Sequence, residues 1–462
     1  MTALPLEPDA EQMATLGAVA LDFAAGFVAD RATAPASNQG DPALPGLLAE
    51  LRTPPPESGR PVEELLALVA RAAGHGVDTA GPGYLGFIPG GGLFSAAVAD
   101  FVTLVVNRLV MVPALGPALA QIEATAVRWL ADLAGLPPPA GGILTSCGSM
   151  ANFSAVVAAR VDRLPDDFRN GTLYVTDQAH HSVGKSAMLA GLPADAVRAV
   201  PTTADLRMDV AALAGMVAAD RRSGRRPCAV VANAGTTNTG AVDPLMELAE
   251  VAAAEGLWFH VDAAYGGMFL LTDRGRALLA GIERADSVTL DPHKGMFLPY
   301  GTGSLVVRDV DLLRRSHRVP APYLPDADAA WSVPSFADLS PELSREMRGL
   351  RVWLPLQLHG IAAFRSALDE KLDLAAAAHR ALAEVPGLEL PWVPELSVVV
   401  FRHRHGDDAT RALLQRVNSS GRVFLSSTTV GGRFTIRLSI LSHRTHGDRV
   451  DEAVKLVAEA AT

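Results

Sequence analysis

The chain has 462 residues, of which 49% are hydrophobic and 19% are charged, and its formal net charge is -10 at pH 7. This balance is typical of a soluble protein that is too long for one simple core, so we expect one large domain and one or two smaller ones. The acidic charge, without a basic face interleaved with aromatic residues, argues against nucleic acid or anionic lipid as a partner.

The N-terminal residues "MTALPLEPDAEQ" lack the charged and then apolar pattern of a targeting segment. The most apolar region, residues 94–120, is interrupted by Asp100, by Arg108 and by prolines. We therefore expect a cytoplasmic protein that does not bind a membrane. The two cysteines, Cys147 and Cys228, are too few for a disulfide framework or a four-cysteine zinc site, and we expect no metal.

The pattern of elements changes along the chain. Residues 14–80 read as helices joined by proline-rich loops without a strand pattern, which predicts an N-terminal helical arm over residues 1–85. Short apolar runs then alternate with amphipathic segments, which predicts an α/β domain with a mixed, mostly parallel sheet over residues 86–350. A long helix and two strands flanking a helix predict a small α+β domain over residues 351–462.

One strand-helix-strand unit can be interpreted closely. "CAVVANAG" reads as a buried strand, and Asp243 with Pro244 supplies an N-cap and first-turn signal. "LMELAEVAAAE" is the predicted helix, Gly256 ends it, and "LWFHVD" is the next strand. Such units give right-handed crossovers between parallel strands.

The predicted strands end in residues that could bind a ligand, which in open α/β sheets lies beyond the carboxyl ends of the strands. After "GGILT" comes "SCGSMANF", where a helix start with Gly148 and Ser149 favours a phosphate. After "TLYVT" comes "DQAHHS" with His180. Each feature alone is more often structural than functional.

Three further strand ends carry Thr237, Asp262 and Lys294. The threonine lies in "GTTNTG" and is most simply explained as a turn residue. A carboxylate at a strand end, such as Asp262, often caps a helix. Lys294 lies in "DPHK" beside Asp291 and His293, where a desolvated ammonium needs a counter-charge or must become neutral. Five such signals at five strand ends are much stronger than any one.

One ligand satisfies all of these positions. Pyridoxal 5'-phosphate presents a phosphate to the Gly/Ser turn, a cationic ring nitrogen to Asp262, a flat face to His180 and Ala264, and an aldehyde to Lys294. The lysine then becomes an imine. We expect burial to lower the pKa of Lys294 and so to make its amine nucleophilic.

The ordered motifs "TSCGSMANF", "DQAHHS", "ANAGTTNTGAVDPL", "FHVDAAYGG", "DPHK", "RGLRVW" and "RFTIRLSI" resemble the group II pyridoxal-phosphate-dependent amino-acid decarboxylases of fold type I. The resemblance covers nearly the whole chain. The combination of "HVDAAY" and "PHK" is specific, whereas the single pieces are not.

The resemblance implies roles for these residues. Lys294 binds the cofactor covalently, His180 stacks on its ring and helps to position the substrate carboxylate, Asp262 pairs with the ring nitrogen, and Ala264 contacts the other ring face. The remaining positions are the phosphate turn and its surroundings, for which the resemblance implies Gly148, Ser149, Thr237 and His293. The family also implies an obligate homodimer with its active sites at the interface.

The product depends on a loop that precedes "RGLRVW". In the decarboxylases of the family a loop tyrosine protonates the substrate carbon after CO2 leaves, and counting back from "RGLRVW" places Phe336 at that position. Phenylalanine has no proton to give, and relatives with this exchange can consume O2 and yield an aldehyde, ammonia and peroxide instead of an amine. If the loop aligns in a different register, Tyr323 or another residue is the proton donor.

The resemblance places Phe87, Ile88, Leu109 and Met111 in the substrate pocket, and these apolar residues favour an aromatic or other apolar L-amino acid. An inward-pointing Arg108 would instead favour an acidic substrate. An aminotransferase or a carbon–carbon lyase of the same fold would share Asp262 and Lys294, and a non-enzymatic scaffold is disfavoured because both residues are present.

Overall fold

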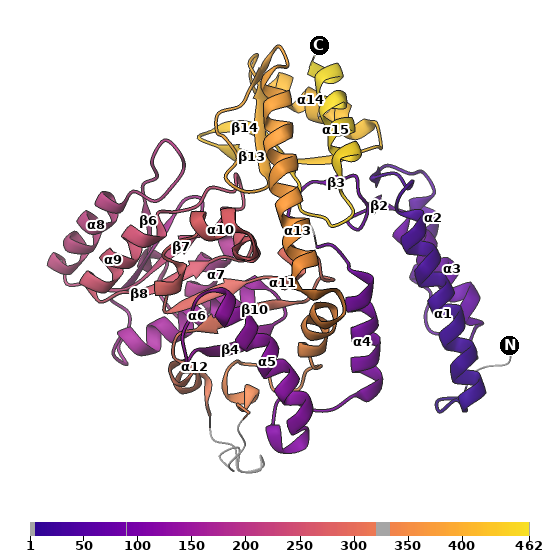
Figure 1. Cartoon of the computed structure of the whole chain (residues 1–462), viewed down its shortest axis with the longest axis horizontal. Helices are drawn as coiled ribbons and strands as arrows, with labels where there is room; N and C mark the ends of the chain where they lie inside the picture. The colour runs from indigo at the N-terminus through magenta and orange to yellow at the C-terminus, as the bar shows by residue number, and fades with distance from the viewer. Residues whose placement is uncertain (1–4, 89, 320–332, 462) are drawn as a thin grey trace. The chain divides into compact units, whose positions relative to one another are not determined.

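The computed structural model describes residues 5–88, 90–319 and 333–461 (Figure 1). The chain forms two compact units: one comprises residues 90–380 and 390–400, and the other comprises residues 1–89, 381–389 and 401–462. The three-part division at residues 85 and 350 stays a prediction.

The first of these units contains a seven-stranded sheet. Its strands, in spatial order, are β4 (Gly141–Thr145), β10 (Gly303–Val307), β9 (Ser287–Leu290), β8 (Trp258–Asp262), β7 (Arg226–Asn233), β5 (Gly171–Thr176) and β6 (Val197–Val200). β10 is antiparallel to both of its neighbours, and the pairs from β9 to β6 are parallel. The mixed, mostly parallel sheet predicted from the sequence is therefore confirmed, with β6 as a strand that the sequence interpretation had not included.

Helices connect these strands. The α-helices of this unit are α4 (Phe94–Val106), α5 (Pro117–Leu133), α6 (Gly148–Arg163), α7 (His181–Leu189), α8 (Val210–Arg222), α9 (Leu245–Glu255), α10 (Asp273–Leu278), α11 (Pro292–Gly295), α12 (Val310–His317) and the long α13 (Gly349–Ala383). Short 3-10 helices are η1 (Pro113–Leu115), η2 (Ala194–Ala196), η3 (Gly266–Leu271), η4 (Ile282–Arg284) and η5 (Phe336–Asp338). Gly360, with φ 71, interrupts α13 with a kink.

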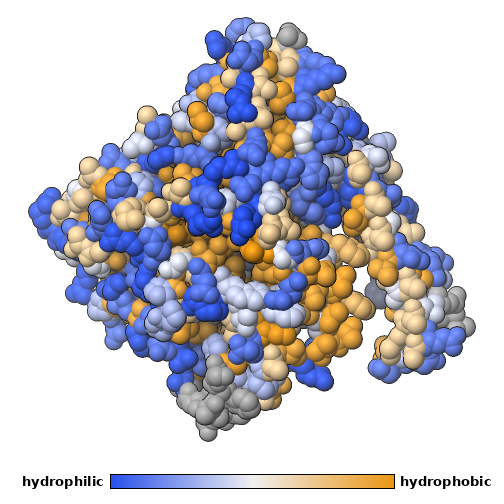
Figure 2. All heavy atoms as spheres, viewed as in Figure 1, coloured by the Kyte–Doolittle hydropathy of each residue, from blue (hydrophilic) through white to orange (hydrophobic). Residues whose placement is uncertain are grey.

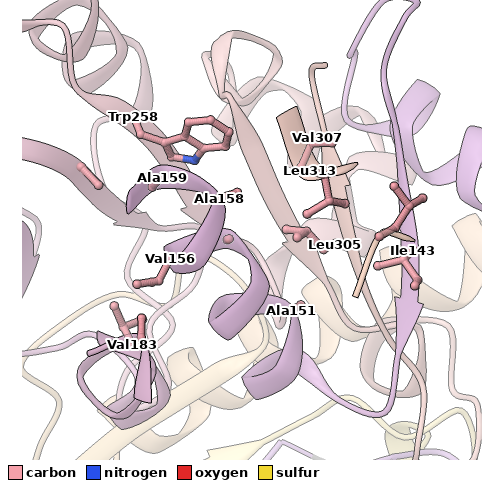
Figure 3. Packing of buried hydrophobic residues seen from close by; sticks show 14 of the residues in the cluster. Ile143, Ala151, Val156, Ala158, Ala159, Val183, Trp258, Leu305, Val307 and Leu313 are labelled. Carbon is pink, nitrogen blue, oxygen red and sulfur yellow. The ribbon is translucent and has the colours of Figure 1, made fainter. Parts of the chain in front are cut away.

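Helix α6 positions the start of the ligand-binding edge because small residues let it lie close to the sheet. Its buried face carries Ala151, Ala155, Ala158 and Ala159, which belong to one hydrophobic cluster with Trp258 (Figure 3). A larger side chain on this face would overpack the core, which typically costs about 1–3 kcal/mol. The alanine pattern thus fixes where the N-terminus of α6 meets the end of β4.

The start of helix α9 differs from the prediction. Pro244 occupies the N-cap position without a side-chain cap, so the assignment of Asp243 as the cap is wrong. The Asp243 carboxylate instead accepts hydrogen bonds from the backbone N–H groups of Met208 and Asn233, each at 2.7 Å, because several donors at this strand end satisfy it. Gly256 ends the helix as predicted, with φ 63.

The second unit holds the N-terminal helices and a five-stranded sheet. Its helices are α1 (Ala10–Asp30), α2 (Leu44–Leu51), α3 (Val62–Ala73), α14 (Asp407–Ser419) and α15 (Gly447–Ala461). The sheet order is β11 (Leu388–Glu389), β12 (Val398–His403), β14 (Arg433–Ser439), β13 (Phe424–Val430) and β3 (Tyr84–Leu85). A two-residue ladder of β1 (Ser37–Asn38) and β2 (Gly76–Val77) corrects the expectation that residues 14–80 form no strand.

Two helices expose apolar surfaces. α4 presents Phe101, Leu104 and Val105 with exposed fractions of 65%, 66% and 70%, and Figure 2 shows a hydrophobic area over this helix. None of the residues of α1 is buried. Among the described residues, α1 is the one helix long and apolar enough to cross a membrane, by length and composition alone.

Candidate active site

The carboxyl ends of the parallel strands converge on a cavity of about 150 Å³. Residues that follow β4, β5, β7, β8 and β9 all line it, as expected for an open α/β sheet. The structure brings together all the residues predicted to bind the cofactor, namely Gly148, Ser149, His180, Thr237, Asp262, Ala264, His293 and Lys294.

Lys294 has a counter-ion in this cavity. Its Nζ lies 3.0 Å from Oδ2 of Asp291, three residues earlier, and its side chain is 24% exposed. Burial alone lowers the pKa of the Lys294 ammonium, but the charges of Asp291 and Asp262 and the hydrogen bond to Asp291 outweigh it, so the pKa is raised. The prediction that burial lowers this pKa is therefore wrong for the protein without its cofactor.

Asp262 lies at the end of β8 and is held by two donors. The side-chain amide of Asn152 donates to Asp262 Oδ2 at 2.8 Å, and the backbone N–H of Ala264 donates to Oδ1 at 3.2 Å. These two donors fix the position of the carboxylate. A carboxylate fixed at this position suits a cationic ring nitrogen.

Behind Asp262 runs a buried chain of hydrogen bonds. Oδ1 of Asn152 accepts from Thr289 at 2.8 Å and lies 3.1 Å from Nε2 of His260. Nδ1 of His260 and the indole N–H of Trp258 both lie 2.8 Å from the Ser287 hydroxyl. Burial lowers the pKa of His260 to about 4, so the ring is neutral, and the pattern of acceptors assigns its proton to Nε2.

His180 is the N-cap of α7, and Nδ1 accepts from the backbone N–H of Ser182 at 3.3 Å. Burial lowers the pKa of His180, against the opposing charge of Asp262, which favours the neutral ring. Because Nδ1 is an acceptor in this arrangement, the ring proton is assigned to Nε2.

The first turn of α6 forms the anion-binding end of the cavity. Cys147 is extended at the N-cap, and its carbonyl accepts from the Thr145 hydroxyl at 2.9 Å, which fixes the turn. The N-terminal N–H groups and dipole of this 16-residue helix favour a phosphate. A Cβ on Gly148 would lie 2.7 Å from Asp291 Oδ2, so only glycine fits here.

Two other motif residues have clear structural surroundings. Nδ1 of His293 lies 2.7 Å from the carbonyl oxygen of Thr302, and burial lowers the pKa of this ring. Gly295 lies so close to Met268 that a Cβ would be 2.4 Å from the Met268 Cβ. This approach explains why a larger side chain does not follow Lys294 in this chain.

The predicted loop and substrate residues are not among those that line the cavity. Phe336 is fully buried in one hydrophobic cluster with Met111, and the backbone N–H of Ala337 donates to the Met111 carbonyl at 3.1 Å. In the other unit, Phe87 is 57% exposed and Ile88 is half-buried. The catalytic assignment of Phe336 and the substrate assignments stay predictions.

Tyr323, the alternative proton donor, lies outside the described residues. Arg108 is exposed, and its guanidinium donates to the carbonyl of Val106 at 3.1 Å. The described residues that line the cavity include no arginine.

Sequence reasoning missed Asn152, Asn233 and Tyr265, which also line the cavity. Asn152 lies four residues after Gly148, on the same face of α6 as the phosphate turn, so helical spacing could have found it. Tyr265 is held by a 2.8 Å hydrogen bond between its hydroxyl and that of Ser397, which no sequence pattern indicates because the two residues are far apart in the chain.

Comparisons with known proteins agree with this geometry. Residues 45–404 match the family model described as the pyridoxal-dependent decarboxylase conserved domain. Over 450 residues the chain is 34% identical to an aromatic-L-amino-acid decarboxylase from Bacillus atrophaeus, a match that covers 95% of this chain and 93% of that protein. It is 27% identical to a phenylacetaldehyde synthase from Arabidopsis thaliana, over 98% of this chain and 96% of that one.

A solved structure is similar along the whole chain. The crystal structure of Oryza sativa TDC with PLP and tryptamine aligns with a TM-score of 0.93 and 28% sequence identity. The alignment covers 100% of this chain and 99% of that chain.

Proposed function

We propose, from the premise that this chain belongs to the pyridoxal-dependent decarboxylase family, that it converts an aromatic L-amino acid into the corresponding amine and CO2. The class of enzyme, an amino-acid carboxy-lyase, and the cofactor, pyridoxal 5'-phosphate, are those of the family. The family match favours decarboxylation over the aminotransferase alternative.

One arrangement carries the mechanism: Lys294 and Asp262 line one cavity with the N-terminus of α6. When bound, the cofactor supplies an aldehyde for the amine and a cationic ring that accepts the electrons left when CO2 departs. Asp262, fixed by Asn152 and the Ala264 N–H, keeps a negative charge at the ring nitrogen's position. The first turn of α6 holds the phosphate.

The remaining residues of the cavity orient the substrate. His180 is neutral and rigidly capped on α7, so it offers a flat ring and one N–H donor to the substrate and the cofactor. Ala264 presents a small side chain, which leaves room for a flat ring.

Two observations support an aromatic substrate. None of the described residues that line the cavity is an arginine that could bind an acidic side chain, and Arg108 points to the surface. The similar protein from Bacillus atrophaeus is named an aromatic-L-amino-acid decarboxylase. Other apolar L-amino acids are the second class that this reasoning allows.

The second candidate function is oxygen-consuming formation of an aldehyde. It is favoured by the phenylalanine at position 336, where the family's decarboxylases carry a proton-donating tyrosine, and by the similarity to a phenylacetaldehyde synthase. The burial of Phe336 beside Met111 favours the amine, because in this arrangement position 336 contributes to the core and the proton donor is a different residue.

One experiment tests the substrate and the product together. The holoenzyme is incubated with aromatic, aliphatic, acidic and basic L-amino acids in air-saturated buffer, and CO2, amine, peroxide and O2 are measured in the same reaction. The proposal expects CO2 with stoichiometric amine from aromatic substrates and no O2 uptake. Peroxide and aldehyde in place of amine would establish the second candidate, and turnover confined to acidic or basic amino acids would overturn the substrate proposal.

We also propose a cytoplasmic homodimer in which apolar surfaces of α4 and α1 are covered by the second subunit. The exposed Phe101, Leu104 and Val105 on α4 form a hydrophobic area that a soluble monomer rarely presents (Figure 2). Helix α1 is apolar and has no buried residue. Light scattering coupled to size exclusion tests this, with a dimer expected for the native chain and a shift toward monomer for Leu104→Glu. Recovery of the unmodified protein in the membrane fraction would instead assign α1 to a bilayer.

A further inference from the structure

Asp291 is a buried carboxylate in contact with the Lys294 ammonium. This ion pair is lost when the lysine gives up its proton to react. It is 2% exposed, and its Oδ2 lies 3.0 Å from the Lys294 ammonium. Its other oxygen, Oδ1, is buried without a hydrogen-bond partner among the described residues. The lysine is therefore the main neutralising group for Asp291 within the described part of the chain.

His293 does not replace the lysine in this role. Its Nε2 lies 3.8 Å from Asp291 Oδ2, beyond hydrogen-bonding distance. Its Nδ1 lies 2.7 Å from the Thr302 carbonyl oxygen, which assigns the proton of the neutral ring to Nδ1. Nε2 then carries no proton and presents a lone pair. A lone pair facing a carboxylate cannot stabilise its negative charge.

Lys294 must lose its proton before it can act as a nucleophile, because only the free amine has a lone pair. At that moment an ionised Asp291 would be left without its counter-ion. It also lies against Gly148, at the turn proposed to hold the phosphate, where a second negative charge is unfavourable. Moving the ammonium proton to the carboxylate removes both problems in one step.

We propose that Asp291 is the proton acceptor for Lys294, taking the proton from Nζ onto Oδ2 across the 3.0 Å contact when the amine has to react, and returning it when the lysine is released. One N–H bond breaks and one O–H bond forms, so the pair changes from two opposite charges to two neutral groups with no net change. This inference rests on the proposed function, in which Lys294 binds the cofactor.

Other titratable groups also face Lys294, namely Asp262, Cys147, His180 and His293. Both oxygens of Asp262 already accept hydrogen bonds, from Asn152 and from the Ala264 N–H. Nδ1 of His180 is engaged by Ser182. The free Oδ1 and the short contact through Oδ2 distinguish Asp291 from these groups.

The test measures covalent capture of pyridoxal by Lys294 in the apoenzyme, not turnover. The absorbance change gives the rate, and borohydride trapping with peptide mass analysis gives the site. Pyridoxal lacks the phosphate, so phosphate binding at the α6 turn does not contribute to the measured rate. The variant is Asp291→Asn, and the matched control is Asp286→Asn, which changes the carboxylate that precedes the same strand, β9, instead of the one that follows it.

At about pH 7 the two possible roles of Asp291 predict opposite signs. If Asp291 were a counter-ion alone, its removal would lower the pKa of Lys294, raise the fraction of free amine and accelerate capture. If it accepts the proton, capture by Asp291→Asn slows, by about 100-fold for a typical positioned base, although the pKa of the lysine falls. Capture as fast as or faster than in the unmodified protein overturns the proposal.

A second variant keeps the test decisive if Asp291→Asn folds poorly. Asp291→Ala removes the carboxylate and leaves space for a small acid, so formate should restore capture while chloride at equal ionic strength should not. Absence of rescue in a folded Asp291→Ala protein overturns the proposal. Failure of the unmodified apoenzyme to capture pyridoxal 5'-phosphate at Lys294 would instead contradict the proposed function itself.

Discussion

The side-chain amide of Asn152 donates to Oδ2 of Asp262 at 2.8 Å, while the carbonyl oxygen of the same amide faces His260 and Thr289. This fixes the orientation of the amide, because its N–H donors must point to the carboxylate and its oxygen to the two donors. Asn152 is therefore a positioning residue for the carboxylate that would pair with the cofactor's ring nitrogen.

Replacing Asn152 should weaken cofactor binding. Asn152→Ala removes one hydrogen bond to a charged acceptor, worth about 1.5–3 kcal/mol, so the dissociation constant of pyridoxal phosphate should rise by about 10- to 100-fold. Equilibrium titration of the apoenzyme by absorbance measures this change. Asn170→Ala, at an exposed position, is the matched control and should bind normally. Unchanged affinity in Asn152→Ala would show that the Ala264 N–H alone holds Asp262.

Lys294 is expected to be indispensable. Lys294→Ala should abolish both the covalent attachment of the cofactor and decarboxylation, because no other lysine lines the cavity among the described residues. Borohydride trapping followed by peptide mass analysis locates the attachment site in the unmodified protein. Lys185→Ala provides a control at a position outside the cavity lining, and retained turnover in Lys294→Ala would contradict the assignment.

Phe336 should matter for stability and not for the identity of the product. A hydroxyl placed by Phe336→Tyr in this fully buried site costs about 1–3 kcal/mol unless it finds a partner, so the free energy of unfolding should fall. Under the proposed function the amine yield stays stoichiometric in both proteins. An unmodified enzyme that forms peroxide, together with a Phe336→Tyr variant that forms more amine, would establish the aldehyde alternative and place this residue at the reacting atoms.

His260 should make the protein less stable in acid. Burial lowers its pKa from 6.5 to about 4 in the folded chain, so the unfolded chain binds a proton that the folded chain does not as the pH falls through this window. The free energy of unfolding is therefore highest above pH 6.5 and falls as the pH drops toward 4, by an amount on the order of 3 kcal/mol. Urea unfolding across this range should show a smaller pH dependence for His260→Gln, and an unaltered dependence would mean that other buried histidines cause it.

Much of the site follows from one rule applied to the sequence. Polar residues after five predicted strands had to meet at one edge of a mostly parallel sheet, so Gly148, His180, Asp262 and Lys294 could be placed together without coordinates. The raised pKa of Lys294 could not be predicted from burial, because its sign depends on the 3.0 Å contact with Asp291. Distances of this kind are set by packing and not by spacing.

Other features lay beyond the reach of local patterns. Asp243 has the sequence signal of a helix cap, but its carboxylate accepts hydrogen bonds from the backbone N–H groups of Met208 and Asn233 instead. Counting back from "RGLRVW" predicts a role for Phe336 at the active site, and its burial in one cluster with Met111 could not be read from the count, because a count assumes a loop length and carries no information on packing. Residues on helix starts and strand ends were thus easier to place than residues on long connections.

The order of the strands along the chain also affects how the protein is made. The phosphate turn at Gly148 leaves the ribosome well before Asp262 and Lys294, and the two later residues enter a sheet whose neighbours come from all parts of the sequence between residues 141 and 307. A ligand stabilises only a state that can bind it, so pyridoxal phosphate cannot guide the early, long-range pairing of this sheet. The early pairing of this sheet must therefore proceed without the cofactor, and chains that stop short of β9 lack Lys294 and cannot bind pyridoxal phosphate covalently.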